Sequence, residues 1–261
     1  MPEKNYDKYS RVLRQTAIEA GAKIMEIREQ KFDVSYKEDS SPVTLADQAA
    51  VKIILRDLQK VAPEIPVVAE ESASDGKIPQ VTDQFWLVDP LDGTKEFIAG
   101  GTDFTVNIAL IENGKPTFGI IYTPATQKLY TAKNPYKATI QDVDASLNQG
   151  VECPIHVRNG ERDNLTALAS KSHLDDKTKA FLEKINIKNH ISAGSSLKFC
   201  VVAEGNADIY PRFGPTMEWD IAAGHAILNA AGGSVTNPDG SAFRYNKLNF
   251  RNDAFIAKGQ F

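Results

Sequence analysis

The sequence predicts an α+β first part followed by an α/β second part. Three observations support this: two amphipathic helices open the chain, short apolar runs follow between residues 66 and 132, and strands then alternate with helices over residues 166–237. With 261 residues, 42% of them hydrophobic, the chain can bury a substantial core. We expect functional groups where strands end and helices begin, because helix N-termini present unpaired N–H groups.

The two opening helices are predicted from apolar periodicity. Apolar residues between Tyr9 and Ile27 recur every three or four positions, which is the period of one helical face. A second such series begins near Thr44 and ends before Pro63, whose ring cannot continue a helix. Asp47 then lies in the first turn of the second helix.

The short apolar runs that follow predict a meander of strands. The run Val67–Ala69 leads into Glu70, and the run FWLV leads into Asp89. The later runs FTVNIALI, TFGIIYT and KLYTA are separated by Asn-Gly and Pro turn signals. Residues 133–165 are polar, and we expect them to be irregular.

Strands and helices alternate in the remaining sequence. The expected strands are TALAS, HISA, ADIYP and GSVTN, and the expected helices between them are Asp175–Ile185, Ser195–Ala203 and Trp219–Ala231. We place a domain boundary in the polar stretch, which divides the chain into residues 1–140 and residues 141–261.

The charge balance limits the class of partner. Thirty basic and 34 acidic residues give a net charge of −4, which argues against binding of a nucleic-acid polymer or an anionic membrane. A local basic pocket for a small polyanion is still compatible with this charge. The sequence does not predict an oligomeric state.

The compartment is predicted from cysteines and hydropathy. Cys153 and Cys200 are far apart in sequence and lack zinc-site spacing, which favours a reducing compartment. There is no signal-peptide pattern and no uninterrupted apolar run of about 18 residues, so we expect no transmembrane segment and a cytoplasmic protein.

The stretch WLVDPLDGTKEF places Asp89 and Asp92 at the end of an apolar strand. Two carboxylates in one small volume raise each other's pKa, and this is costly unless a cation lies between them. Asp-Pro and Asp-Gly are also common turn dipeptides, so the stretch alone is equally compatible with a plain turn.

Hard oxygen ligands recur at the other predicted junctions. Glu70 ends a strand, Asp220 opens a helix, and Pro90 could leave the Leu91 carbonyl free as a ligand. Carboxylates without His or Cys suit Mg²⁺ better than zinc. Clustered Mg²⁺ beside the helix start at Thr94 points to phosphate ester hydrolysis, with Thr94 and Asp47 orienting the attacking water.

Three motifs together resemble the metal-site motifs of one family. AEES at 69–72, DPLDGT at 89–94 and WDIAAGHAILNAAGG at 219–233 are similar in order and spacing to those of the inositol monophosphatase superfamily of Mg²⁺-dependent, lithium-inhibited phosphatases. Within it, the stretches DGTKEFI, SKSH, GSSLKFC and EGNADIYPRFGPTMEWD are similar to bisphosphate nucleotidases of the CysQ type. The resemblance implies a layered αβαβα sandwich and hydrolysis of adenosine 3′,5′-bisphosphate to AMP.

The resemblance also implies a role for each matching residue. It implies two or three Mg²⁺ ions, with the metal motifs in residues 1–140 and the last ligand and the nucleotide contacts in residues 141–261. Glu70, Asp89, the Leu91 carbonyl, Asp92 and Asp220 would ligate metal, and Asp47, Thr94 and Glu70 would be catalytic. The implied substrate-binding residues are Glu70, Leu91, Asp92, Gly93, Thr94, Ser172, His173, Gly194, Ser195, Ser196, Lys198, Arg212 and Asp220. Peripheral association with the inner membrane rests on family analogy alone.

The region around Lys198 could bind the second phosphate of a bisphosphate substrate. Ser195, Ser196, Lys198 and Arg212 offer hydroxyls, a predicted helix N-terminus and two cations for a phosphate distant from the metals. By family analogy the Ser172-His173 pair would lie against the adenine ring. Lys198 can also be interpreted as a solvated helix lysine.

Two alternative functions remain open at this point. One is an inositol-1-phosphate phosphatase, although Glu218 is adjacent to Trp219 and so displaced from the place of the sugar-binding Glu in inositol-selective relatives. The other is a non-catalytic nucleotide or metal sensor, which would have no use for a water-activating pair. The phosphosulfate relative of adenosine 3′,5′-bisphosphate is a further possible substrate.

Overall fold

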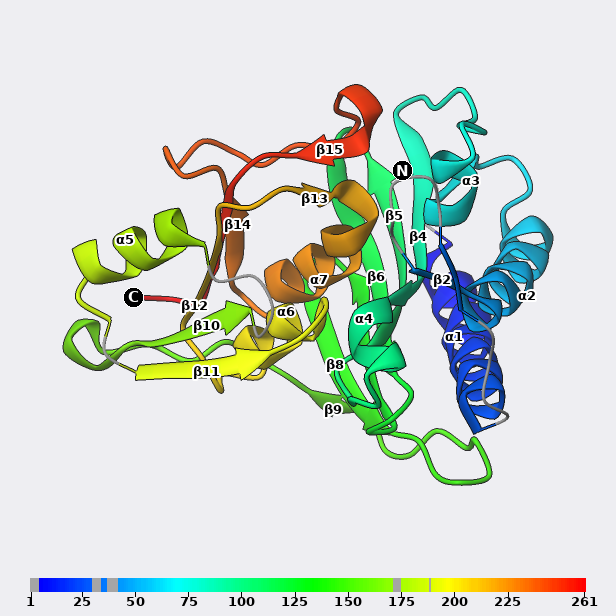
Figure 1. Cartoon of the computed structure of the whole chain (residues 1–261), viewed down its shortest axis with the longest axis horizontal. Helices are drawn as coiled ribbons and strands as arrows, with labels where there is room; N and C mark the ends of the chain where they lie inside the picture. The colour runs from blue at the N-terminus through cyan, green and yellow to red at the C-terminus, as the bar shows by residue number, and fades with distance from the viewer. Residues whose placement is uncertain (1–4, 30–33, 37–41, 171–174, 188) are drawn as a thin grey trace.

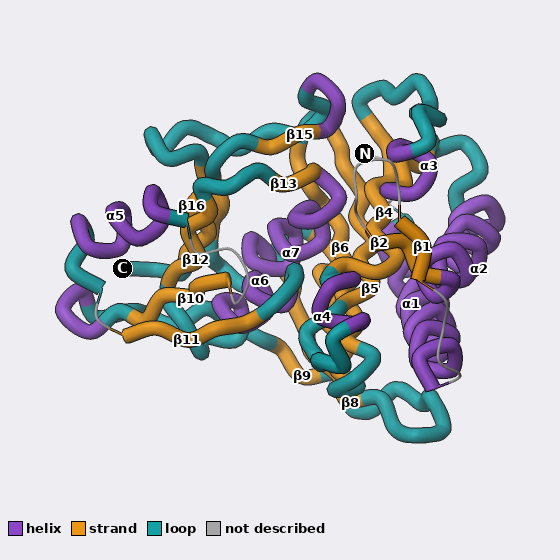
Figure 2. Tube along the Cα trace, viewed as in Figure 1, coloured by secondary structure: helices purple, strands orange, loops and turns teal. Residues whose placement is uncertain are grey.

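The chain folds into five layers, which confirms the predicted αβαβα sandwich (Figure 1). The computed structural model describes residues 5–29, 34–36, 42–170, 175–187 and 189–261. Figure 2 shows one helix pair at one edge, a second pair between the two sheets, and a single helix at the opposite edge. No helix in these described ranges is long and apolar enough to cross a membrane.

The first layer is the helix pair predicted from apolar periodicity. It consists of α1 (Tyr6–Glu29) and α2 (Leu45–Val61), each slightly displaced at its ends from the prediction. The antiparallel pair β1 (Val34–Tyr36) and β2 (Pro42–Thr44) lies between them in the chain and was not predicted. Strands of three residues are too short for a periodic signal.

The second layer is a seven-stranded sheet in the order β3-β4-β5-β6-β7-β8-β9. Only β3 and β4 pair in parallel, and the other neighbours are antiparallel. The strands are β3 (Val67–Ala69), β4 (Gln84–Asp92), β5 (Thr105–Glu112), β6 (Lys115–Thr123), β7 (Lys128–Asn134), β8 (Lys137–Asp142) and β9 (Cys153–Pro154). The expectation of an irregular stretch at 133–165 was wrong for β8 and β9, which complete this sheet.

The two faces of this sheet pack against different helices. Trp86 and Val88 belong to the core that includes α1 and α2, whereas Phe85 and Leu87 belong to the core that lies between the sheets. This alternation is the period of two expected for a strand buried on both faces. The sheet therefore holds the helical layers on either side of it.

The third and fourth layers come from the second half of the chain. The helices α6 (Leu197–Ala203) and α7 (Glu218–Ala230) lie between the seven-stranded sheet and a five-stranded sheet in the order β11-β10-β12-β16-β14. The strands are β10 (Thr166–Ser170), β11 (Asn189–Ala193), β12 (Ile209–Arg212), β14 (Ser234–Thr236) and β16 (Phe255–Lys258). Only β16 among these was not predicted, and it pairs antiparallel with both β12 and β14.

The fifth layer is α5 (Asp176–Lys184), which covers the outer side of the five-stranded sheet. Asp175 caps it by accepting a hydrogen bond from the Thr178 N–H at 2.8 Å. Shorter elements connect the layers: α3 (Glu70–Ser74), α4 (Thr94–Ile98), β13 (Thr216–Met217), β15 (Arg251–Asn252) and the 3₁₀ turns Arg162–Asn164 and Leu248–Phe250. The domain division at 140/141 stays a prediction.

Gly119 lets α7 approach the seven-stranded sheet closely. A Cβ at this position would lie 2.7 Å from the Ala223 carbonyl oxygen and 2.9 Å from the Ala226 Cβ. We therefore expect Gly119→Ala to lower the free energy of unfolding by about 1–3 kcal/mol, measured by urea denaturation. The matched control is Gly214→Ala, whose Cβ would come no closer than 3.5 Å to its neighbours. Equal stability of the two variants would contradict close packing here.

Candidate functional site

The strand β4 ends in a turn that gathers polar groups. Its pairing with β5 shifts register between Asp89 and Asp92, so the ladder is interrupted across Pro90 and Leu91. The Asp89 carboxylate accepts the Leu91 N–H at 3.1 Å, and the Thr94 hydroxyl donates to the Leu91 carbonyl at 3.0 Å. These two hydrogen bonds close the turn on itself.

Gly93 is required by the backbone at this turn. Its φ is 88°, in the left-handed region that side chains rarely adopt. A Cβ would also lie 2.7 Å from the Asp103 carbonyl oxygen. Gly93 thus permits the chain to pass from β4 into α4 at close range.

A cavity of about 260 Å³ opens where the strand ends and helix starts meet. It brings together most of the residues proposed from sequence. From the first part of the chain it is lined by Asp47, Glu70, Asp92, Gly93, Thr94, Lys95 and Glu96. From the second part it is lined by Ser195, Ser196, Lys198, Phe199, Tyr210, Arg212, Thr216, Asp220 and Ile221.

Five carboxylates line the cavity: Glu96 lies in α4, and the other four come from four further elements. Asp47 lies in the first turn of α2, Glu70 begins α3, Asp92 ends β4, and Asp220 lies in the first turn of α7. The Asp220 Oδ2 atom accepts the Met217 N–H at 2.7 Å. Asp89 does not line the cavity and is 2% exposed.

The carboxylates influence one another electrostatically. Burial raises the pKa of Asp89 well above its ordinary value, and the charges of Glu70, Asp92, Asp220 and Asp47 raise it further. Burial, together with Asp92 and Glu70, likewise raises the pKa of Asp220. Burial also raises the pKa of Asp92, although Lys198 and the Ser196 N–H oppose this. A bound cation would relieve this repulsion.

The donor set fits a hard cation such as Mg²⁺. Asp47, Glu70, Asp92 and Asp220 supply carboxylate oxygens, which Mg²⁺ prefers. The Leu91 carbonyl, which accepts the Thr94 hydroxyl, would add a further oxygen, although Leu91 does not line the cavity. Within the described ranges, however, no three His, Cys, Asp or Glu side chains already stand close enough together to hold one ion. A cation held by three of these carboxylates would therefore require them to move closer together.

The Gly194–Ser196 segment is held by aspartates of the first part of the chain. The Gly194 N–H donates to Asp103 Oδ2 at 2.8 Å, and the Ser196 N–H donates to an Asp92 oxygen. Ser195 adopts a φ of 45°, a conformation that costs free energy in a residue other than glycine. Gly194 is not among the cavity-lining residues.

The two serines are placed differently from the expected helix start. The helix begins at Leu197 with Ser196 as its N-cap, not at Ser195. The Ser196 hydroxyl lies 2.8 Å from both Thr105 Oγ1 and Asn107 Oδ1. The N–H of Ser196 thus donates a hydrogen bond to Asp92, and its hydroxyl forms hydrogen bonds with β5.

Lys198 is a buried cation at the end of the cavity. Its side chain is 4% exposed in the fold, its ammonium donates to the Ser195 carbonyl, and it lies 5.2 Å from the centre of the Tyr210 ring. Burial lowers the Lys198 pKa to about 8, although the Asp92 charge opposes this shift. The interpretation of Lys198 as a solvated surface lysine was wrong.

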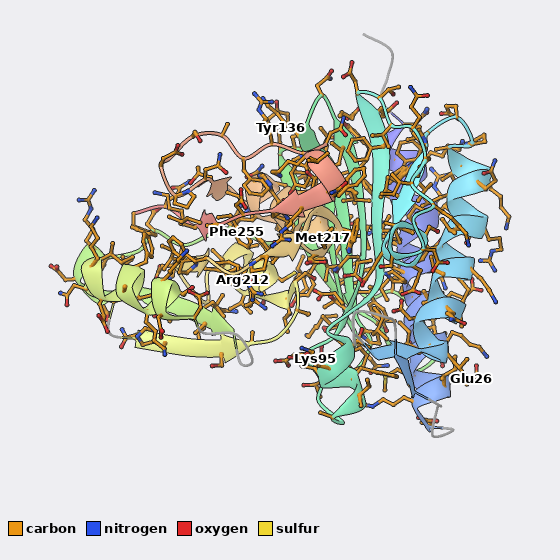
Figure 3. All side chains as sticks on the ribbon, turned by 45° about the horizontal axis from the view of Figure 1, so that its top comes forward. Glu26, Lys95, Tyr136, Arg212, Met217 and Phe255 are labelled. Carbon is orange, nitrogen blue, oxygen red and sulfur yellow. The ribbon has the colours of Figure 1, made fainter. Side chains whose placement is uncertain are left out.

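Arg212 lines the same cavity from the end of β12. Its Nε donates to the Gly214 carbonyl at 3.4 Å, and Figure 3 shows the residue near the middle of the molecule. Lys198 and Arg212 come from the second part of the chain and face a cavity whose carboxylates come mostly from the first part. Ser172 and His173 lie outside the described residues.

Sequence reasoning missed several lining residues. Tyr210 lies two positions before Arg212 on β12, so strand alternation could have placed both on one face. Lys95 and Glu96 lie in the first turn of α4, directly after Thr94. No sequence signal indicates Thr216, which reaches the cavity through the β13–β15 pairing.

Glu218 does not belong to the cavity. Its side chain is fully buried and accepts the N–H groups of Asn246 and Lys247 at 2.9 and 3.0 Å. The buried His225, whose Nδ1 lies 3.0 Å from the Tyr245 hydroxyl, is a core histidine. Cys200 is likewise a buried core residue.

The fold and the acidic cavity define a class of layered αβαβα proteins with an oxygen-rich site between two sheets. The model of the inositol monophosphatase family matches residues 5–259. The chain therefore belongs to the inositol monophosphatase family.

Its relatives include bisphosphate nucleotidases. The 3′(2′),5′-bisphosphate nucleotidase CysQ of Salmonella typhimurium is 45% identical over 244 residues, covering 92% of this chain and 96% of the relative. The CysQ of Escherichia coli K12 is 43% identical, with the same coverage of both chains.

Solved structures agree with the fold. The CysQ of Bacteroides thetaiotaomicron has a TM-score of 0.78 and 38% identity, covering 97% of this chain and 98% of that one. An IMPase of Thermotoga maritima has a TM-score of 0.77 and 25% identity, covering 96% and 92%. The two structures are thus equally similar in fold, but the CysQ sequence is more similar to this chain.

Proposed function

We propose that the protein is a Mg²⁺-dependent 3′(2′),5′-bisphosphate nucleotidase that hydrolyses the 3′-phosphate of adenosine 3′,5′-bisphosphate to AMP and phosphate. The observation that supports this most directly is the division of charge within one cavity. Asp47, Glu70, Asp92 and Asp220 form an acidic part, and Lys198 and Arg212 form a basic part, while Lys95 and Glu96 of α4 line the cavity as well. Such a cavity suits a ligand with one phosphate for the metals and another for the cations.

The metal residues would be those gathered around the β4 turn. Glu70, Asp89, the Leu91 carbonyl, Asp92 and Asp220 would hold two or three Mg²⁺ ions. When bound, Mg²⁺ polarises phosphate oxygens, makes water a better nucleophile and stabilises the leaving oxygen.

The remaining residues would orient water and substrate. Asp47 and Thr94 would position the attacking water in line with the scissile bond, and its proton would pass toward this pair. In this assignment the Gly93–Thr94 backbone would lie beside the scissile phosphate. Ser195, Lys198 and Arg212 would bind the 5′-phosphate, and Ser172 and His173 would contact the adenine.

Two observations favour this substrate over inositol-1-phosphate. A second phosphate would pair with the buried Lys198 and the half-buried Arg212, which both line the cavity, whereas inositol-1-phosphate has no second phosphate to pair with them. Glu218 is bound to residues 246 and 247 and does not line the cavity, so it does not offer a carboxylate for a sugar there. The phosphosulfate relative of the substrate fits the same assignment.

The proposal is tested by phosphate release from adenosine 3′,5′-bisphosphate with Mg²⁺ and with EDTA. We expect turnover with Mg²⁺ and loss of turnover with EDTA that added Mg²⁺ restores. Turnover that persists after complete metal removal would contradict it. A cytoplasmic location belongs to the same proposal, and the unpaired Cys153 and Cys200 agree with a reducing compartment.

Lithium is expected to inhibit at concentrations well below those at which salt has a general effect. This prediction follows from membership of the family, with the small ion replacing Mg²⁺ at its weaker site. The measurement is phosphate release in matched concentrations of LiCl and NaCl. Equal inhibition by the two salts would contradict the prediction.

The pKa of Lys198 predicts a pH dependence. Because this pKa is about 8, the ammonium loses its charge as the pH rises above that value. We expect kcat/KM for adenosine 3′,5′-bisphosphate to fall above about pH 8, toward the level of a Lys198→Ala variant, while kcat/KM for 3′-AMP changes little. Arginine keeps its charge in this range, so Lys198→Arg should abolish the fall. A fall that persists in Lys198→Arg would assign it to another group.

A further inference from the structure

The first turn of α7 is attached to a distant part of the chain by buried polar groups. The strand β13 just before this helix pairs antiparallel with β15, joining Thr216 to Asn252 and Met217 to Arg251. Asn252 and Glu218 are both fully buried. Figure 3 shows Met217 near the middle of the molecule.

A continuous chain of hydrogen bonds runs through this attachment. The Asn252 Nδ2 donates to the Met217 carbonyl at 2.8 Å and to Thr216 Oγ1 at 3.2 Å. The Asn252 Oδ1 accepts the Lys247 ammonium at 2.9 Å, and the same ammonium lies 3.2 Å from Glu218 Oε1. We call Glu218, Lys247 and Asn252 the helix anchor.

The helix anchor leads directly to the candidate metal site. The amide of Asn252 fixes the Met217 carbonyl, and the Met217 N–H in turn holds Asp220 Oδ2 at 2.7 Å. Thr216, the other residue that Asn252 holds, lines the cavity. Both residues that accept hydrogen bonds from Asn252 therefore connect it to the site.

Burial makes this arrangement costly unless every polar group is satisfied. A buried carboxylate or amide that lacks a hydrogen-bond partner destabilises the fold. Glu218 meets this requirement through two backbone N–H groups and Lys247, whose ammonium also lies 4.1 Å from the centre of the Phe243 ring. A chain that needed only packing here could use apolar residues instead.

We infer that Asn252, fixed by the Lys247–Glu218 pair, is a positioning residue that orients Asp220 for Mg²⁺ and Thr216 for the substrate. The inference rests on the proposed function, because it takes Asp220 as a metal ligand. Partners that orient metal ligands commonly change metal affinity about 10–100-fold when they are replaced. Asn252 would act in this way through the backbone of Met217.

The test is Mg²⁺ binding without substrate, measured by calorimetry and by the Mg²⁺ concentration that gives half of the maximal thermal stabilisation. We expect Asn252→Leu, which is similar in size but has no amide, to raise this concentration about tenfold. Asn252→Ala, which leaves room for a water on the Met217 carbonyl, should raise it several-fold and serves if the leucine variant does not fold.

The matched control is Tyr245→Phe, in the same chain segment. It removes the buried hydroxyl that lies 3.0 Å from His225 Nδ1, a contact separate from the hydrogen bonds that lead to Asp220. We expect it to lower Tm while leaving the Mg²⁺ midpoint unchanged. If the Asn252 variants behave in the same way, with a lower Tm and a wild-type Mg²⁺ midpoint, Asn252 is only structural and the inference is overturned.

Asp220→Asn separates failure of this inference from failure of the proposed function. If wild type and Asp220→Asn bind Mg²⁺ equally well, the metal assignment itself is wrong. If Asp220→Asn loses binding and the Asn252 variants do not, only the positioning role is wrong.

Discussion

Asp220→Asn is expected to reduce kcat for adenosine 3′,5′-bisphosphate at least about 1000-fold while leaving the fold intact. The substitution removes a charge that Mg²⁺ needs and that contributes several kcal/mol to the stabilisation of the transition state, and ~4 kcal/mol corresponds to this factor. The same result is expected for Asp92→Asn. Phosphate release at limiting and at saturating Mg²⁺ provides the measurement.

The fold should survive because the substitution relieves repulsion. Burial, Asp92 and Glu70 raise the Asp220 pKa, so in the absence of metal a neutral amide is well tolerated at this position. The side-chain amide oxygen that Asp220→Asn introduces can still accept the Met217 N–H, so α7 keeps this hydrogen bond in its first turn. A folded Asp220→Asn enzyme with wild-type turnover at both Mg²⁺ concentrations would show that the metal assignment is wrong.

Lys198→Ala and Arg212→Ala are each expected to reduce kcat/KM for adenosine 3′,5′-bisphosphate at least about tenfold. Each side chain is proposed to make a charge-assisted contact worth about 1.5–3 kcal/mol with a phosphate that does not reach the metals. Hydrolysis of 3′-AMP, which lacks that phosphate, should change little. The measurement is the ratio of kcat/KM for the bisphosphate to kcat/KM for 3′-AMP.

A charge-matched control is Lys179→Ala on α5. Lys179 is half exposed and pairs with Asp176 on the helix surface, so its removal changes net charge without touching the cavity. The ratio of kcat/KM for the bisphosphate to kcat/KM for 3′-AMP should be the same in Lys179→Ala as in wild type. An equal loss on both substrates in the Lys198 and Arg212 variants would assign these residues to the fold or the metal site, and an unchanged ratio would favour inositol-1-phosphate.

Local signals predicted most of the fold. Apolar periodicity identified the helices α1 and α2, and short apolar runs between turn signals identified the strands β4 to β7. The strand β16 is four residues long and near the end of a polar stretch, and its place between β12 and β14 is set by pairing across the chain. No local pattern contains that information.

Most of the predicted site residues line the cavity, and their roles stay predictions, whereas contacts between distant segments were not predicted. The DPLDGT stretch places Asp92, Gly93 and Thr94 together by turn geometry alone. The hydrogen bond from the Ser196 N–H to Asp92 joins two segments that are distant in sequence, so no local pattern could predict it. The connection from Asn252 to Asp220 through Met217 could not be predicted for the same reason.

Phosphate release from adenosine 3′,5′-bisphosphate, inositol-1-phosphate and fructose-1,6-bisphosphate, measured side by side at saturating Mg²⁺, tests the central claim most directly. Two cation contacts of about tenfold each predict a kcat/KM for adenosine 3′,5′-bisphosphate about 100-fold above that for inositol-1-phosphate. An equal or higher kcat/KM for inositol-1-phosphate would contradict the assignment of the basic part of the cavity to a second phosphate.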